Sequence, residues 1–104
     1  MLPQIGQLPT TSGALYTVPA KFFARLKWLQ AVTVSAAVVQ FFTTVRGRQV
    51  ALTQPVSLDG GTLLNVLKGV ELRLDSSASI SGVSTVTDTD FVIAGDEELN
   101  ERNQ

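Results

Sequence analysis

The chain has 104 residues, of which 44% are hydrophobic and 16% charged, a composition that predicts one folded domain and excludes a disordered chain. It contains neither cysteine nor histidine, which excludes disulfides, thiolate nucleophiles, imidazole catalysis and the commonest metal ligands. The formal net charge of −1 is uneven, because residues 1–74 carry seven basic and two acidic side chains while residues 75–104 carry one basic and seven acidic.

These properties lead us to expect a protein without enzymatic activity, cofactor or metal. The uneven charge indicates either that electrostatic attraction directs docking to a partner, or that the charges are simply distributed unevenly over a surface that faces water. A weakly acidic chain also disfavours general nucleic-acid binding. The first residues lack the basic and apolar regions of a signal peptide, and no apolar stretch is long enough for a membrane-spanning helix, so we expect no membrane association.

Residues 1–13 contain two prolines and two glycines and favour neither a helix nor a central strand. We expect an extended N-terminal arm, whose isolated apolar residues are Leu2, Ile5 and Leu8. Either the arm is a disordered leader, or it lies along a neighbouring subunit and buries these three side chains there. The second hypothesis makes Leu2, Ile5 and Leu8 partner-binding residues.

A first strand is predicted from Ala14 and ends at Pro19, because proline cannot donate to a ladder. The run 22–34 alternates and predicts a long strand, with an amphipathic helix as the competing interpretation. One face is predicted to enter the core and holds Phe22, Ala24, Leu26, Trp28, Val32 and Val34.

The other face of this long strand carries two cations, Arg25 and Lys27, and two large apolar residues, Phe23 and Leu29. Exposed apolar residues beside polar ones often mark a contact surface, so we expect these four residues to bind a partner. The alternative is a register change or β-bulge that buries Phe23 and Leu29 instead.

The rest of the chain also favours strands, with turn signals at Arg46-Gly47-Arg48 and Asp59-Gly60-Gly61. We therefore expect an antiparallel β-sandwich or jelly-roll-like domain of about six to eight strands over residues 14–94, followed by a short acidic tail over 95–104. Strands are predicted at 37–45, at 49–58 with a break at Pro55, at 70–75 and at 83–94, a loop at 76–82, and a helical turn or a strand at 62–68.

One resemblance is carried by the segment Ala14-Leu15-Tyr16-Thr17-Val18-Pro19-Ala20 and the alternating strand after it. Further along, the chain has Ser57-Leu58-Asp59-Gly60-Gly61-Thr62, then Leu72-Arg73-Leu74 before the small-residue loop 75–79. In this order the motifs resemble those of the small β-sandwich virion proteins of tailed bacteriophages, from about Leu15 to Ile93. The chain departs from that pattern at Lys21-Phe22-Phe23, where such proteins usually have glycine, and at Val34-Ser35-Ala36, where they usually have an Asn-Thr pair.

The resemblance implies a structural protein of the virion, assembled in the host cytoplasm. A head decoration (cement) protein that stabilises the capsid is the first expectation, and a neck, tail or fibre component is the alternative. The partners it implies are the major capsid protein or neck and tail proteins. Self-association, in the form of a homo-oligomer such as a trimer, is expected as well.

Two other functions are considered, one that uses a pair of carboxylates and one that uses aromatic side chains. Asp88 and Asp90 could share a cation or act as a glycosidase pair, but two carboxylates are too few ligands for calcium and a chain this short leaves little room for a cleft. A carbohydrate-binding module is the rival function, with Trp28, Tyr16 and the Phe22-Phe23 pair as a stacking platform. Because Trp28 shares its predicted face with Leu26 and Val32, the core is its expected place.

Overall fold

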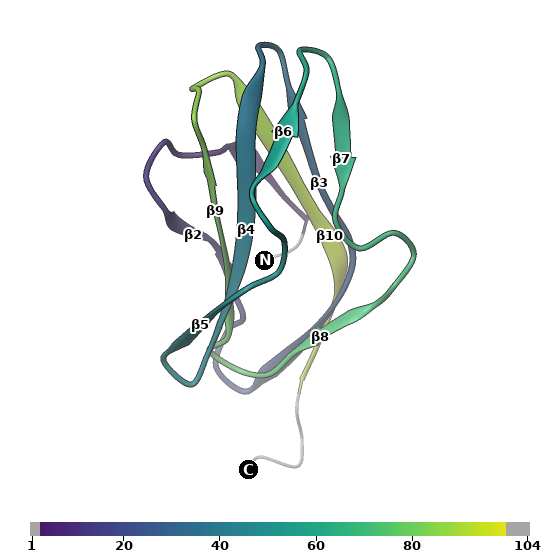
Figure 1. The fold of residues 1–104 in the computed structure, drawn as a ribbon. Helices are drawn as coiled ribbons and strands as arrows, with labels where there is room; N and C mark the ends of the chain where they lie inside the picture. Colours follow the sequence, from purple (N-terminus) through teal and green to yellow (C-terminus); the bar gives the residue numbers. More distant parts are fainter. Residues whose placement is uncertain (1–2, 100–104) are drawn as a thin grey trace.

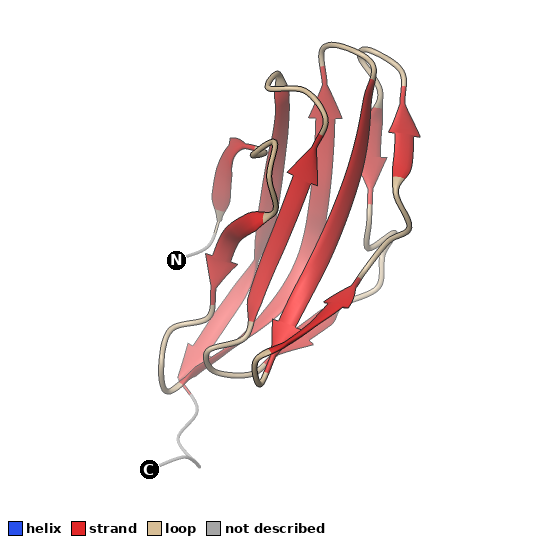
Figure 2. Cartoon of the chain, turned by 60° about the vertical axis from the view of Figure 1, so that its left-hand side comes forward, coloured by secondary structure: helices blue, strands red, loops and turns tan. Residues whose placement is uncertain are grey.

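The computed structural model describes residues 3–99, which form only strands, turns and loops (Figure 2). The expected all-β, antiparallel class is confirmed. The described residues hold ten strands rather than six to eight, and these form two five-stranded sheets. The strands are β1 (Gln4–Gln7), β2 (Gly13–Thr17), β3 (Phe22–Thr33), β4 (Ala37–Val45), β5 (Arg48–Ala51), β6 (Val56–Leu58), β7 (Leu63–Asn65), β8 (Leu72–Leu74), β9 (Ser79–Ser84) and β10 (Thr89–Leu99).

Each sheet is organised around one long strand that pairs with two short strands along the same edge. In sheet A the order is β1-β10-β3-β7, and β8 also pairs with β3; in sheet B it is β2-β9-β4-β5, and β6 also pairs with β4. Proline cannot donate a backbone hydrogen bond, so Pro55 separates β5 from β6 as the sequence predicts. Positive φ angles at Lys68 and Gly69 turn the chain between β7 and β8.

The two sheets lie one behind the other and share a single hydrophobic core (Figure 1). Alternate residues of β4 point inward, and Phe41 at its centre is fully buried. Gly82 on the neighbouring β9 leaves room for Phe41, because a Cβ at Gly82 would lie 3.1 Å from the Phe41 ring and 2.8 Å from Leu8. The largest buried side chains come from both sheets and include Phe41, Leu8, Leu26, Leu29, Ile80 and Ile93.

The expected N-terminal arm is wrong for the described residues. Gln4–Gln7 form β1, an edge strand of sheet A that pairs with β10 in the register Ile5 to Val92. Leu8 is only 1% exposed and packs in the core of its own chain, so it is not free to bind a partner. Ile5 points away from the core and remains a candidate contact residue, while Leu2 lies outside the described residues.

The acidic tail also begins later than predicted. β10 continues to Leu99 and pairs with β3 as far as Phe22, so residues 95–99 belong to sheet A. Within this part of the strand, Asp96 and Glu98 lie beside the cations Lys27 and Arg25 of β3. The rest of the predicted tail, residues 100–104, lies outside the described residues.

A β-bulge in β3 reverses the direction of its side chains halfway along the strand. Leu26 pairs with Gly95 and Trp28 with Ala94, which leaves Lys27 without a paired residue. Trp28 is therefore 52% exposed instead of entering the core, and Leu29 is 0% exposed instead of facing a partner. Both predictions were wrong for the same reason, and the bulge that was the alternative for Leu29 is the arrangement found.

Polar groups close the core at both ends. At one end, toward the last residues of β10, the Tyr16 hydroxyl of sheet B donates a hydrogen bond of 2.5 Å to the Glu97 carboxylate of sheet A. At the other end, the buried Thr89 hydroxyl lies 2.8 Å from the Ser84 hydroxyl and donates to the Thr33 hydroxyl at 3.1 Å. The hydrogen bond from Tyr16 to Glu97 joins the two sheets, and the contacts of Thr89 satisfy buried hydroxyl groups.

Candidate interaction surface

The outer face of sheet A carries large apolar side chains that the core does not use. Ile5 is 71% exposed, Leu63 58% and Val32 41%, and Val32 lies on the opposite face of β3 from the buried Ala31 and Thr33. Together with Val92 and Trp28 they cross four strands, because Ile5 pairs with Val92, Val32 with Leu63, and Trp28 with Ala94 next along β10. We call Ile5, Trp28, Val32, Leu63 and Val92 the apolar stripe.

Such a stripe is not needed to form the sheet, because the inner face already supplies the core. Antiparallel sheets that face water on one side usually alternate apolar and polar residues, so large apolar residues on the outer face depart from that pattern. Exposed apolar patches that are rimmed by polar residues mark interaction sites, whereas single exposed apolar residues are ordinary. The stripe is therefore the strongest candidate for a functional surface among the described residues.

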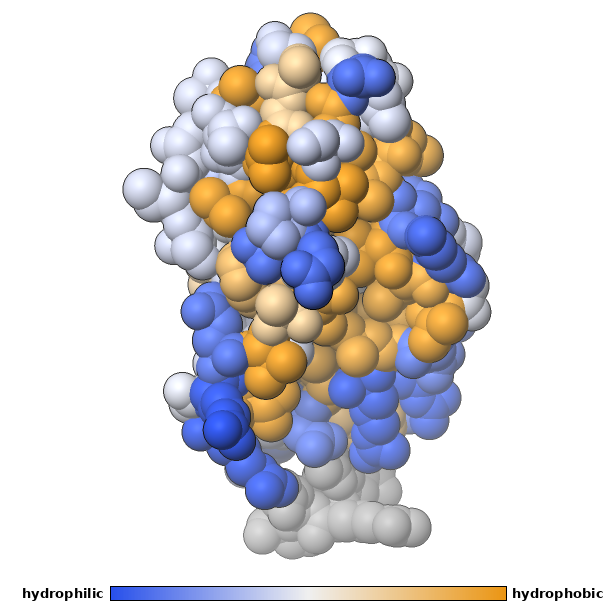
Figure 3. Space-filling view, viewed as in Figure 1, coloured by the Kyte–Doolittle hydropathy of each residue, from blue (hydrophilic) through white to orange (hydrophobic). Residues whose placement is uncertain are grey.

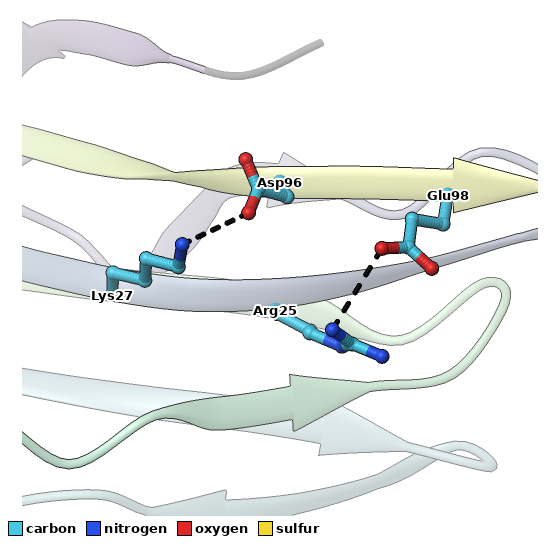
Figure 4. A network of polar contacts seen from close by, with 4 residues as sticks. All are labelled: Arg25, Lys27, Asp96 and Glu98. Atoms are coloured by element: carbon cyan, nitrogen blue, oxygen red, sulfur yellow. Dashed lines mark ion pairs between the residues drawn. The ribbon is translucent and has the colours of Figure 1, made fainter.

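Below the stripe, the same face carries two cross-strand ion pairs between β3 and β10 (Figure 4). Lys27 Nζ lies 3.0 Å from Asp96 Oδ2, and Arg25 Nη1 lies 3.7 Å from Glu98 Oε1. The hydrogen bond to Asp96 and its negative charge raise the pKa of Lys27. All four side chains are about half exposed, so the pairs contribute little to folding stability and leave this part of the face polar and electrically balanced.

Phe23 lies on this polar part of the face and is covered by cations. Its ring centroid is 4.4 Å from the Arg73 guanidinium carbon and 5.5 Å from that of Arg25. Three of the four residues predicted for the exposed face, Phe23, Arg25 and Lys27, are thus brought together, while Leu29 is not. The stacked guanidinium groups cover the ring, so Phe23 offers less free apolar surface than the stripe above it.

A surface hollow of about 320 Å³ lies beside Trp28 and is lined by Lys27, Trp28, Gly69, Val70 and Glu71. The loop that forms its far wall is held by backbone hydrogen bonds, from Val66 N to Leu29 O and from Val70 N to Leu67 O, both 2.8 Å long. The wall is therefore ordered, and Trp28 projects from a strand rather than from a loop. Sequence reasoning missed this hollow because it placed Trp28 in the core.

The charged residues divide the molecule along its long axis. The β3–β4, β6–β7 and β9–β10 turns, at the upper end in Figure 1, hold Asp59 and Asp88 and contain no lysine or arginine. The described cations lie outside these three turns. Figure 3 shows hydrophilic residues gathered toward the lower end of the molecule. One end of the molecule is thus acidic, and the other carries cations mixed with carboxylates.

The two side-chain clusters weighed from the sequence have the following arrangement in the structure. Asp88 accepts a hydrogen bond of 2.6 Å from the Ser35 hydroxyl, and its Oδ1 is buried without a hydrogen-bond partner. Within residues 3–99, no three acidic side chains come together to hold a metal ion. Tyr16 is buried while Trp28 is exposed, so these two aromatic rings do not form a common platform.

Comparison with protein-family models, with curated proteins and with solved structures found no match for this chain. Over the part of the chain that the structure describes, no helix could cross a membrane.

Proposed function

We propose that this protein is a non-enzymatic structural protein of a tailed-phage particle, where it acts as a decoration (cement) protein that stabilises the capsid. It works by binding proteins, and the observation that carries this proposal is the apolar stripe on the outer face of sheet A. Its partners are the major capsid protein or, in the alternative position, proteins of the neck, tail or fibre. Its location is the virion, and it self-associates there as a homo-oligomer.

The strand order supports this proposal. If β5 with β6, and β7 with β8, each count as one interrupted strand, there are eight strands over residues 3–99. The sheet orders then become first-eighth-third-sixth and second-seventh-fourth-fifth. This is the order of a jelly-roll sandwich, an architecture found in viral capsid proteins and in lectins. We propose this finer fold on that order, and the phage assignment rests on the sequence motifs around Tyr16 and Gly60.

The chemistry of the surface fits docking to protein. Burial of the stripe supplies the favourable free energy of association, because each Å² of apolar surface removed from water contributes about 25 cal/mol. The ion pairs Lys27 to Asp96 and Arg25 to Glu98 border the stripe and supply orientation more than affinity.

The experiment is incorporation of Val32→Lys protein into particles. Val32 is exposed, so the substitution leaves the core intact, whereas burial of the lysine charge in an interface carries a desolvation penalty of several kcal/mol, even beside its cross-strand neighbour Asp90. We expect the variant to fold normally and to be lost from purified particles. Val38→Lys, on the outer face of sheet B with similar exposure, is the matched control and should be retained. Normal incorporation of Val32→Lys would refute the proposal.

A second candidate function, carbohydrate binding, is favoured by the exposed Trp28 and the hollow beside it. An indole ring can stack on the apolar face of a sugar while Lys27 and Glu71 bond to its hydroxyl groups. A glycan array probed with the wild-type protein and with Trp28→Ala tests this function. A sugar bound by the wild type and lost in the variant would support it, and a silent array would remove it.

A further inference from the structure

We infer that the β4–β5 hairpin of sheet B binds an acidic surface of a partner protein through Arg46 and Arg48 at its tip. This hairpin is separate from the apolar stripe, which lies on sheet A, so the inference goes beyond the proposed function. Three features of the hairpin support it: two arginines without an ionic partner, a strained turn that holds one of them, and exposed valines beside them.

Within residues 3–99, the guanidinium groups of Arg46 and Arg48 have no ionic partner. Both residues are exposed, and the ion pairs of this part of the chain use three other cations. The two arginines flank Gly47 at the tip of the hairpin, which lies at the lower left corner of the molecule in Figure 1. Two like charges at one turn repel each other, and a carboxylate bound between them would remove that repulsion.

The turn that holds Arg46 favours other residue types. Val45 pairs with Arg48, which makes Arg46-Gly47 a two-residue loop, and both of its φ angles are positive, at 54° and 77°. Such loops favour Asn-Gly, because asparagine and glycine adopt a positive φ more readily than residues with long side chains. Arginine therefore strains this turn, and within residues 3–99 it forms no ion pair in return. An exposed residue held in this way indicates a role in binding.

The hairpin also carries apolar surface beside the arginines. Val45 and Val50 lie on the same face of the hairpin as the buried Thr43, but they lie where the core ends and are 38% and 50% exposed. Arg48 shares this face because it pairs with Val45. Arginine is enriched at the contacts between proteins, whereas nucleic-acid binding depends on many phosphate contacts and gains little from valine. A protein surface is therefore the partner that this combination fits.

The chemistry of arginine defines what this partner must present. A planar guanidinium group donates two parallel hydrogen bonds to the oxygens of one carboxylate, which lysine cannot do. Arg46 and Arg48 together therefore suit a surface with aspartate or glutamate side chains close to each other. Charges at the edge of an interface direct association more than they add affinity, so the contact should weaken as the salt concentration rises.

Binding to polyglutamate tests the inference, because the side chains of this polypeptide are carboxylates only. Arg46→Asn removes one cation and suits the turn, and Arg48→Gln removes the other. Isothermal titration calorimetry of the full chain at low salt should show that the wild type binds polyglutamate. The double variant should bind about tenfold more weakly, because it loses the hydrogen bonds of both guanidinium groups to carboxylates.

Lys68→Asn is the matched control. Lys68-Gly69 is an exposed turn with φ angles of 49° and 85°, and Lys68 likewise forms no ion pair within residues 3–99. Lys68→Asn and Arg46→Asn each remove one positive charge, and each should raise the urea midpoint of unfolding by roughly 0.3 M. Only Arg46→Asn should weaken binding to polyglutamate. Equal losses of binding in the two variants would mean that net charge alone drives the contact, and the inference would be wrong.

A DNA oligonucleotide separates carboxylate from phosphate as the group that the hairpin recognises. Tighter binding of the wild type to the oligonucleotide than to polyglutamate, lost in the double variant, would identify a nucleic-acid surface and overturn the inference. A wild type that binds neither polymer at low salt would overturn it as well. Neither result bears on the apolar stripe, which Val32→Lys tests separately.

Discussion

At the scale of single residues, Tyr16 is the group whose ionisation the fold opposes most clearly. Burial raises its pKa above the usual value of 10.0, and the hydrogen bond to Glu97 and the Glu97 charge raise it further. The folded protein therefore keeps the Tyr16 proton at a pH at which the unfolded chain loses it. The stabilisation is fully present below pH 10 and is lost as the pH rises from there toward the folded-state pKa.

We predict that the free energy of unfolding falls above about pH 10 by as much as ~1.4 kcal/mol per pH unit through Tyr16. Urea denaturation at a series of alkaline pH values measures this slope, and Tyr16→Phe should remove the part due to the phenol. Tyr16 is the only tyrosine in the chain, so tyrosinate absorbance reports on it directly. A phenol that titrates near pH 10 in the folded protein would contradict the prediction.

Thr89 tests the buried hydroxyl chain at the other end of the core. Thr89→Val keeps the shape of the side chain but removes its contacts with the hydroxyls of Ser84 and Thr33. A buried group left without its partner costs about 1–3 kcal/mol, so we predict a loss of that size in the free energy of unfolding. Thr87→Val, at an exposed position of the nearby turn, should be close to neutral in the same denaturation experiment. Equal effects of the two substitutions would show that the hydroxyl chain is unimportant.

At the scale of elements, the bulge in β3 decides which residues reach the outer face of sheet A. It depends on Gly95 of β10, because a Cβ at that position would lie 2.1 Å from the Arg25 carbonyl oxygen. A backbone atom cannot move aside as a flexible side chain can. Gly95 is therefore required for the close approach that accompanies the change of face between Leu26 and Trp28.

We predict that Gly95→Ala lowers the free energy of unfolding by about 3 kcal/mol, at the upper end of the range for overpacking. Gly13→Ala is the matched control, since a Cβ there would meet its nearest atom at 3.5 Å, an ordinary contact. Trp28 is the only tryptophan, so its fluorescence reports on the bulge as well. Emission typical of an exposed indole is expected for the wild type, and emission typical of a buried indole would contradict the register described here.

The elements also show where the sequence was informative. Strict alternation located β4, and Pro55 correctly indicated a broken strand over 49–58. The single strand predicted over 83–94 was wrong, because β9 ends at Ser84 and a turn separates it from β10. A segment of small residues such as 76–82 gives no period-two signal, although Ile80 and Gly82 lie in the middle of a sheet.

The errors at the candidate surface have a common cause. Alternation fixes the face of each residue only while the pairing register is unbroken, and the bulge near Lys27 exchanged the places of Trp28 and Leu29. The only residue that signalled the bulge was Gly95, and it lies far away in the sequence, on the partner strand β10. The burial of Leu8 likewise depends on the space left by Gly82, a contact between residues 74 positions apart that no local pattern reveals.

At the scale of the whole molecule, the two sheets share one core and should unfold together. The chain provides a natural probe in each sheet, Trp28 in sheet A and Tyr16 in sheet B. We predict that tryptophan fluorescence and the near-ultraviolet signal of tyrosine follow the same urea transition, as a two-state domain requires. Separate midpoints for the two probes would show that the sheets unfold independently.

The position of β10 has a consequence for how the protein is made. This strand lies between β1 and β3 in sheet A, yet it holds the last of the described residues to leave the ribosome. A nascent or truncated chain that lacks it has the flanks of the sheet without the middle, and cannot present Val92 beside Ile5. Folding of sheet A must therefore await the synthesis of β10, and chains terminated before this strand would lack a complete outer face of sheet A.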